Sequence, residues 1–153
     1  MSDGMFRCPT QIVQCRQFQD ALDSILSGRS WALMTSDGWM DRGITNKFRH
    51  QPNAVIAGVK PNPKQSELAE FAMSIPNVDV VVSLGGGSVM DATKAALVVR
   101  GLGERGMEIL NAHLREGALL PKHIQLPEFI AAPTTSGSGS EVTRWGTIWG
   151  DDG

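Results

Sequence analysis

Residues 79–91 read DVVVSLGGGSVMD, and they carry most of the information about the fold. The run 79–84 is apolar and β-branched almost throughout, a pattern typical of a strand that is covered on both faces. Three glycines and a serine follow, and residues 91–99 (DATKAALVV) then have the composition of a buried helix. A strand, a glycine turn and a helix in this order predict a parallel sheet.

The same alternation of helical and extended segments continues on both sides of this stretch. Residues 18–26 and 65–73 carry apolar side chains at the spacing of one helical face. Residues 61–63 (PNP) exclude regular structure, and residues 143–149 (TRWGTIW) predict the start of a β-hairpin. Short apolar runs predict further strands at 31–35, 54–59 and 129–132. We therefore expect an α/β fold with a Rossmann-like doubly wound parallel sheet, in one domain spanning residues 1–153.

Composition and charge exclude several classes of protein. The net charge is −2 and basic residues do not cluster, which argues against nucleic-acid binding. No apolar run approaches the ~18 residues of a membrane helix, and the first ten residues lack a signal peptide's apolar core, so we expect a cytoplasmic protein. Cys8 and Cys15 are expected to be structural or surface thiols, a metal or disulfide role being the alternative. Ordinary loop or surface positions are expected for His50, His113 and His123.

The turn after the predicted strand 79–84 consists of Gly85, Gly86, Gly87 and Ser88. Glycines let backbone N–H groups close around a phosphate, and the N-terminus of the following helix favours negative charge. The serine adds a hydroxyl donor. The pattern is neither GxGxxG nor GxxxxGK[ST], which argues against those two nucleotide-binding motifs. A tight turn that simply needs small residues explains the glycines equally well.

A second segment rich in hydroxyl groups, residues 133–141 (PTTSGSGSE), follows the predicted strand 129–132. Loops at the carboxyl ends of parallel strands are where an open α/β sheet binds its ligand. Five hydroxyl side chains and two glycines within 134–140 suit ribose, amide and base edges. The alternative is a flexible linker, which fits poorly with a segment that leaves a buried strand.

Asp37 stands just after the predicted strand 31–35. A carboxylate there can accept hydrogen bonds from the adenosine ribose and would repel a 2′-phosphate. Taken alone, an aspartate in a turn or at a helix N-cap explains this residue equally well.

Residues 85–94 (GGGSVMDATK) and 133–143 (PTTSGSGSEVT) resemble the two signature segments of the iron-containing alcohol dehydrogenases, a metal-dependent group related to glycerol dehydrogenase and dehydroquinate synthase. The segments 32–37 (ALMTSD) and 61–63 stand at the expected order and spacing. The resemblance implies hydride transfer between NAD(P) and a small primary alcohol or aldehyde. The stretch SDGWMDRG (36–43) is faintly similar to phosphonoacetaldehyde reductases, while the hydroxyl-rich loop argues against a synthase of the dehydroquinate type.

The resemblance also implies which residues bind the cofactor. The glycine turn would hold the pyrophosphate, the hydroxyl loop would line the adenine and ribose, and the acidic residue after the first strand would favour NAD over NADP. Asp91 would lie near the nicotinamide end, whereas Lys94 is structural. Ser138 stands where most relatives carry threonine, a change that keeps the hydroxyl. The full set is Asp37, Gly85, Gly86, Gly87, Ser88, Asp91, Thr134, Thr135 and Ser138.

In this family a second, all-helical domain supplies one aspartate and three histidines to a divalent iron or zinc, which polarises the alcohol oxygen. This chain has no such set, so we expect it to be the nucleotide-binding half, without metal ligands or catalytic residues and inactive alone. A non-catalytic nucleotide-binding or self-assembly module is the alternative. We also expect a homo-oligomer, formed through an exposed strand edge or an apolar patch at Trp145, Ile148 and Trp149.

Overall fold

Four parallel strands form one sheet in the order β2-β1-β3-β4. The computed structural model describes residues 10–143 and 145–151. Its strands are β1 (Trp31–Thr35), β2 (Ala54–Ile56), β3 (Val80–Gly85) and β4 (Glu128–Pro133). In register, Leu33 of β1 lies opposite Val82 of β3. The parallel sheet expected from the sequence is confirmed.

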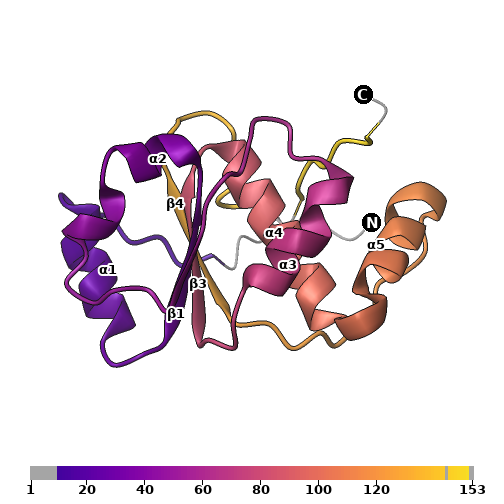
Figure 1. The fold of residues 1–153 in the computed structure, drawn as a ribbon, viewed down its shortest axis with the longest axis horizontal. Coiled ribbons are helices and arrows are strands. Elements are labelled where there is room, and N and C mark those ends of the chain that lie inside the picture. The colour runs from indigo at the N-terminus through magenta and orange to yellow at the C-terminus, as the bar shows by residue number, and fades with distance from the viewer. Residues whose placement is uncertain (1–9, 144, 152–153) are drawn as a thin grey trace, which may run out of the picture.

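Helices cover both faces of this sheet (Figure 1). One face packs against α1 (Phe18–Leu26), α2 (Asp37–Asp41) and a 3-10 turn (Ile44–Lys47). The other face packs against α3 (Leu68–Ser74), which follows a 3-10 turn (Gln65–Glu67), and against α4 (Gly87–Gly101). After another 3-10 turn (Gly103–Arg105), α5 (Gly106–Glu116) packs on α4. The fold is therefore doubly wound and Rossmann-like, as expected. None of the described helices is long and apolar enough to cross a membrane.

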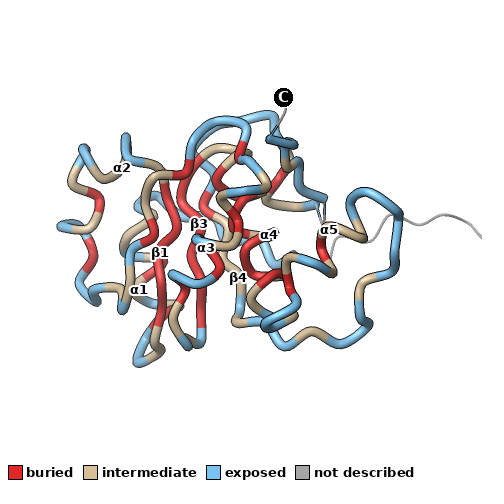
Figure 2. Tube along the Cα trace, turned by 45° about the vertical axis from the view of Figure 1, so that its right-hand side comes forward, coloured by how far each residue is buried: buried red, intermediate tan, exposed pale blue. Residues whose placement is uncertain are grey.

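Two apolar clusters separated by the sheet form the core. Alternate residues of a strand point to opposite faces, so neighbouring positions of β1 and β3 belong to different clusters. Ala32, Met34 and Val81 face α3 and α4, whereas Leu33 and Val82 face α1. All of β3 is buried, and the buried chain in Figure 2 follows the central strands. The prediction of a strand covered on both faces is confirmed.

Several expected boundaries differ from the observed ones. The helix expected over 91–99 begins at Gly87, because Gly87 and Ser88 of the glycine turn form its first positions. Only three residues of the run 54–59 pair as a strand, and helices α2 and α5 were not predicted from the sequence. Boundaries are the least reliable part of any such prediction.

The β-hairpin expected over 143–149 is wrong. Among the described residues of this segment, 143 and 145–149, the only strand-like pairing is a parallel bridge between Trp149 and Lys64. The Trp149 amide donates to the Pro63 carbonyl at 2.9 Å, and the Trp149 carbonyl accepts from the Gln65 amide at 2.9 Å. Residues 63–65, distant in sequence, thus pair with Trp149 in place of the neighbouring strand that a hairpin requires. Ile148 packs against the core, whereas Trp145 and Trp149 are exposed, and self-association stays a prediction.

Candidate functional site

Between β1 and β3 the chain switches from building one side of the sheet to building the other. From β1 it proceeds outward to β2, then crosses to β3 on the other side of β1 and continues to β4. In open α/β sheets the crevice at the carboxyl ends of such strands is where ligands bind. The Thr35 hydroxyl of β1 donates a buried 2.7 Å hydrogen bond to the Leu84 carbonyl of β3 and fixes the two strand ends together. Asp37 and the glycine turn both follow these ends.

The glycine turn leads directly into the N-terminus of α4. Gly86 is the N-cap of this 15-residue helix, and Gly87 and Ser88 are its first residues. The first N–H groups of a helix have no intrahelical partner. No side chain of the described residues caps this end, and its first turn contains no acidic residue. The helix dipole and the exposed amides therefore favour an anion at the crevice.

The hydroxyl loop, residues 134–139, lies directly beside the glycine turn. The Thr134 amide donates to the Gly85 carbonyl at 2.9 Å. A Cβ on Gly86 would stand 3.2 Å from the Thr135 hydroxyl oxygen, and one on Gly87 would stand 3.1 Å from the Ser138 Cβ. Thr134, Thr135 and Ser138 are all exposed. In Figure 1 this loop passes over the carboxyl ends of the strands. The structure thus brings the two predicted segments together.

Asp37 borders the same crevice on the side of β2. It is the first residue of α2, whose N-cap is Ser36, so Asp37 is not itself the cap. Its carboxylate is exposed, and a Cβ on Gly58 would lie 4.0 Å from Asp37 Oδ1. Gly58 has a φ of +84°, a conformation that side chains rarely adopt. The sequence reasoning missed Gly58, whose only signal was a glycine after an apolar run.

Ser88 links the glycine turn to the loop at residues 61–63. Its Oγ accepts a hydrogen bond of 3.3 Å from the Asn62 amide, and Asn62 has a φ of 57°. The Ser88 hydroxyl keeps its own proton available for donation to an anion. The position of residues 61–63 matched the family resemblance, but no local feature of the sequence indicated the contact between Asn62 and Ser88.

Asp91 lies one turn further along α4, with its carboxylate engaged by the chain itself. Asp91 accepts from the Ser140 hydroxyl, and its Oδ2 accepts from the Thr147 amide at 3.0 Å. Lys94 Nζ lies 3.7 Å from Asp91 Oδ1 and donates to the Trp145 carbonyl at 2.7 Å. Burial lowers the pKa of Lys94, and the neighbouring Asp91 partly opposes this shift. The two side chains thus hold the chain that follows the hydroxyl loop.

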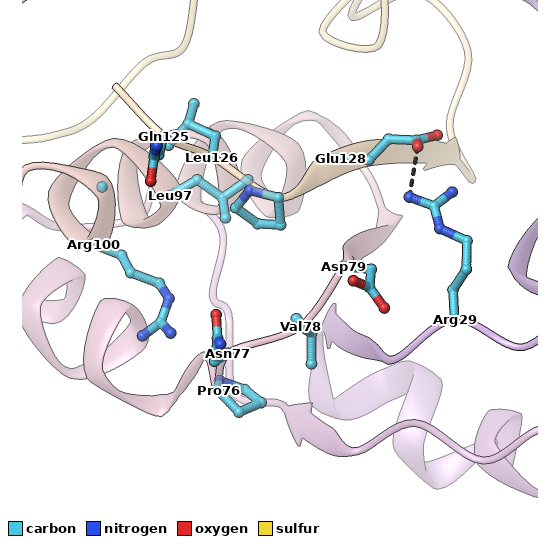
Figure 3. Close-up of a pocket in the computed structure, with 12 residues that line it drawn as sticks. Arg29, Pro76, Asn77, Val78, Asp79, Leu97, Arg100, Gln125, Leu126 and Glu128 are labelled. Carbon is cyan, nitrogen blue, oxygen red and sulfur yellow. Dashed lines mark ion pairs between the residues drawn. The ribbon is translucent and has the colours of Figure 1, made fainter. Parts of the chain in front are cut away.

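A hollow of about 680 Å³ lies at the opposite edge of the sheet, near the amino ends of β3 and β4 (Figure 3). Arg29 forms an ion pair with Glu128 there at 2.8 Å. Asp79 accepts hydrogen bonds from Ser30, which lower the pKa of its carboxyl. None of the predicted site residues lines this hollow, and both of its carboxylates already have partners.

Metal ligands do not gather in the part of the chain that the structure describes. There, no three His, Cys, Asp or Glu side chains lie close enough together to hold an ion. His50 lies 3.6 Å from Asp23, and His113 Nδ1 lies 2.6 Å from the Ala118 carbonyl oxygen. These residues do not fit a divalent iron or zinc. Cys15 is exposed, and Cys8 lies outside the described residues.

Comparison with known proteins agrees with this arrangement. The family model for iron-containing alcohol dehydrogenases matches residues 9–153. The chain belongs to this family. An iron-containing alcohol dehydrogenase from Thermococcus thioreducens superposes with a TM-score of 0.80 at 25% identity, over 96% of this chain and 41% of that one. The fold of this chain therefore corresponds to one part of that alcohol dehydrogenase.

Two further relatives are named as aldehyde reductases. The phosphonoacetaldehyde reductase of Streptomyces viridochromogenes is 27% identical over 123 residues, which are 80% of this chain and 29% of the relative. The sulfoacetaldehyde reductase of Bifidobacterium kashiwanohense, solved in complex with NAD⁺, superposes with a TM-score of 0.63 at 28% identity, covering 82% of this chain and 33% of that one. The chain thus spans about a third of these iron-containing alcohol dehydrogenase relatives.

Proposed function

We propose that this chain binds a nicotinamide dinucleotide, NAD in preference to NADP, as the cofactor-binding domain of an oxidoreductase. The uncapped N-terminus of α4, at the point where the chain switches from one side of the sheet to the other, carries the proposal. Backbone N–H groups at such a helix end suit a pyrophosphate. The NAD⁺ complex of the sulfoacetaldehyde reductase relative supports it.

Each part of the dinucleotide has a proposed place. The pyrophosphate lies against Gly86, Gly87 and Ser88, whose amides and hydroxyl donate to it. The hydroxyl loop contacts the adenine and its ribose through Thr134, Thr135 and Ser138. Asp37 accepts from the ribose hydroxyls, with Gly58 leaving the space beside it open. Gly85 is buried below the turn and acts by letting α4 approach β3.

The whole protein is proposed to transfer a hydride between the bound dinucleotide and a small primary alcohol or aldehyde. The two relatives named as reductases of phosphonoacetaldehyde and sulfoacetaldehyde favour a short aldehyde that carries an acidic group. This chain's part in that reaction is to bind and orient the dinucleotide.

Titration of the chain with NADH tests the proposal. We expect saturable energy transfer from tryptophan to the reduced nicotinamide, with weaker binding of NADPH. Trp39 in α2 is half-buried and stands two residues from Asp37, on the adenosine side of the proposed site, so it is one of several donors. The variant Trp39→Phe should keep the affinity, measured by calorimetry, while losing only part of the transfer. Absence of saturable NADH binding by calorimetry would contradict the proposal.

Replacing Asp37 with serine should change the preference between the two cofactors. The exposed carboxylate accepts from the ribose of NADH and repels the 2′-phosphate of NADPH, so its removal weakens the first complex and strengthens the second. We expect the ratio of the two dissociation constants to shift by about 10-fold, or about 1.4 kcal/mol.

Asp41→Ser provides the matched control for this change. Asp41 is also an exposed aspartate of α2, at the other end of the same helix. Its replacement should leave the ratio of the NADH and NADPH dissociation constants as in the unmodified chain. If Asp37→Ser leaves the ratio of the two dissociation constants unchanged, Asp37 does not contact the ribose of the cofactor.

A further inference from the structure

We propose that Asp91 is a positioning residue, which fastens the chain after the hydroxyl loop to α4 and so holds that loop over the glycine turn before any nucleotide arrives. This inference rests on the proposed function only for what the loop recognises. We call residues 140–143 and 145–149 the strap.

Asp91 joins two separate points of the strap to the helix. The Ser140 hydroxyl donates to one carboxylate oxygen, and the Thr147 amide donates to the other at 3.0 Å. Ser140 is only 6% exposed, so this contact lies inside the protein. A Cβ on Gly146 would stand 3.4 Å from the Asp91 Cα, which places the strap directly on the helix surface. The carboxylate therefore sets the distance between the strap and α4.

Lys94 reinforces the same attachment one turn further along α4. Its ammonium group donates to the Trp145 carbonyl at 2.7 Å and lies 3.7 Å from Asp91 Oδ1. The side chains of Lys94 and Asp91 are only 17% and 14% exposed. The opposite charges of Lys94 and Asp91 offset each other in this half-buried place. Charged acceptors form stronger hydrogen bonds than neutral ones.

The far end of the strap is attached to the loop that Ser88 contacts. Trp149 pairs through its backbone with Pro63 and Gln65, and the Asn62 amide donates to the Ser88 hydroxyl oxygen. The strap, residues 62–65 and the start of α4 thus form a closed cycle of contacts that includes Ser88 of the glycine turn. Asp91 is the point where this cycle meets the helix near the hydroxyl loop.

The hydroxyl loop depends on this attachment because it is fixed only at its ends. It leaves β4 at Pro133 and reaches Ser140 seven residues later, with Gly137 and Gly139 at φ values of +94° and +67°. These two glycines leave its interior adaptable. When the Ser140 end is released, fewer molecules carry a loop ready to bind. The apparent affinity falls in proportion to that fraction.

The hydrogen bonds of the two Asp91 carboxylate oxygens indicate how Asp91 contributes to cofactor binding. Both already accept from donors of this chain, which turns the carboxylate toward the strap. We therefore expect Asp91 to act through the strap, with equal effects on NADH and NADPH. Asp37, by contrast, distinguishes the two cofactors.

The test combines hydrogen exchange of the strap with cofactor titration in Asp91→Ala, Asp91→Asn and Ser140→Ala. In Asp91→Ala, exchange of the Thr147 amide and its neighbours should become about 10-fold faster, and both dissociation constants should rise by about the same factor, with their ratio unchanged. Asp91→Asn keeps an acceptor oxygen and should recover part of both effects. Ser140→Ala removes the donor instead of the acceptor and should loosen the same segment, which keeps the inference testable if an Asp91 variant fails to fold.

Two results would overturn the inference. Unchanged strap exchange in both Asp91→Ala and Ser140→Ala would show that Asp91 does not hold the segment. Weaker NADH binding in Asp91→Ala with unchanged exchange would make it a direct contact. If the unmodified chain binds neither cofactor, the proposed function fails, while the exchange measurements still decide whether Asp91 fastens the strap.

Discussion

Gly86→Val should reduce NADH affinity by at least about 100-fold while the chain stays folded. Gly86 has an extended backbone with a φ of −80°, which valine adopts without strain. Its Cβ would lie 3.2 Å from the Thr135 hydroxyl oxygen, and the valine methyl groups would occupy the space between the two loops. The pyrophosphate would lose one or two hydrogen bonds at about 1.5–3 kcal/mol each.

The measurement is the NADH titration, with far-ultraviolet circular dichroism to verify the fold. Gly150→Val is the matched control, because no atom lies within 4 Å of a Cβ at Gly150 and its φ is not positive. This control should bind NADH as the unmodified chain does. Unaltered affinity in Gly86→Val would mean that no phosphate lies at the N-terminus of α4.

Gly85→Ala should lower the free energy of unfolding by about 1–3 kcal/mol, since an added methyl group has no room at this position. Its Cβ would lie 2.5 Å from Val89 Cγ2 and 2.7 Å from Val89 Cβ. Val89 is 4% exposed in the first turn of α4, and a valine in a helix strongly prefers one rotamer. The helix must therefore move away from β3. Urea unfolding followed by circular dichroism measures the loss.

A second substitution separates this clash from other causes. Val89→Ala removes the closest methyl group but leaves Val89's Cβ in place, so we expect the double variant Gly85→Ala/Val89→Ala to be more stable than the sum of the two single effects indicates. The coupling in the double-mutant cycle measures this contact. Additive effects of the two changes would show that Gly85 and Val89 do not meet.

The central strands were predictable because their signal is local. The run 79–84 needed only its own β-branched residues to indicate a strand covered on both faces, and β3 is wholly buried. The glycine turn and the hydroxyl loop were also readable, since each follows a strand and parallel strands end at one edge of the sheet. Their mutual approach at Gly86 and Thr135 was implied by the fold and is seen in the structure.

The remaining features depend on contacts between distant residues. The segment 143–149 has the composition of a strand, but Trp149 pairs with the chain around Lys64 instead of folding back on its neighbours. Asp91 carried no local signal for its bonds to Ser140 and Thr147, which lie 49 and 56 positions away. Helix α5 consists largely of good helix formers, but it is short and begins at Gly106 directly after a 3-10 turn, and packing on α4 stabilises it.

The bond between Asp91 and Thr147 also bears on the order of events during refolding. Strand β3 and helix α4 are adjacent in sequence, so their contacts close short loops and form early. The Asp91–Thr147 bond closes a loop of 56 residues, and the entropic cost of closure grows with loop length. The groove beside the glycine turn is therefore completed after the unit of β3 and α4 has formed, and a nucleotide added to refolding chains would find its full site only then.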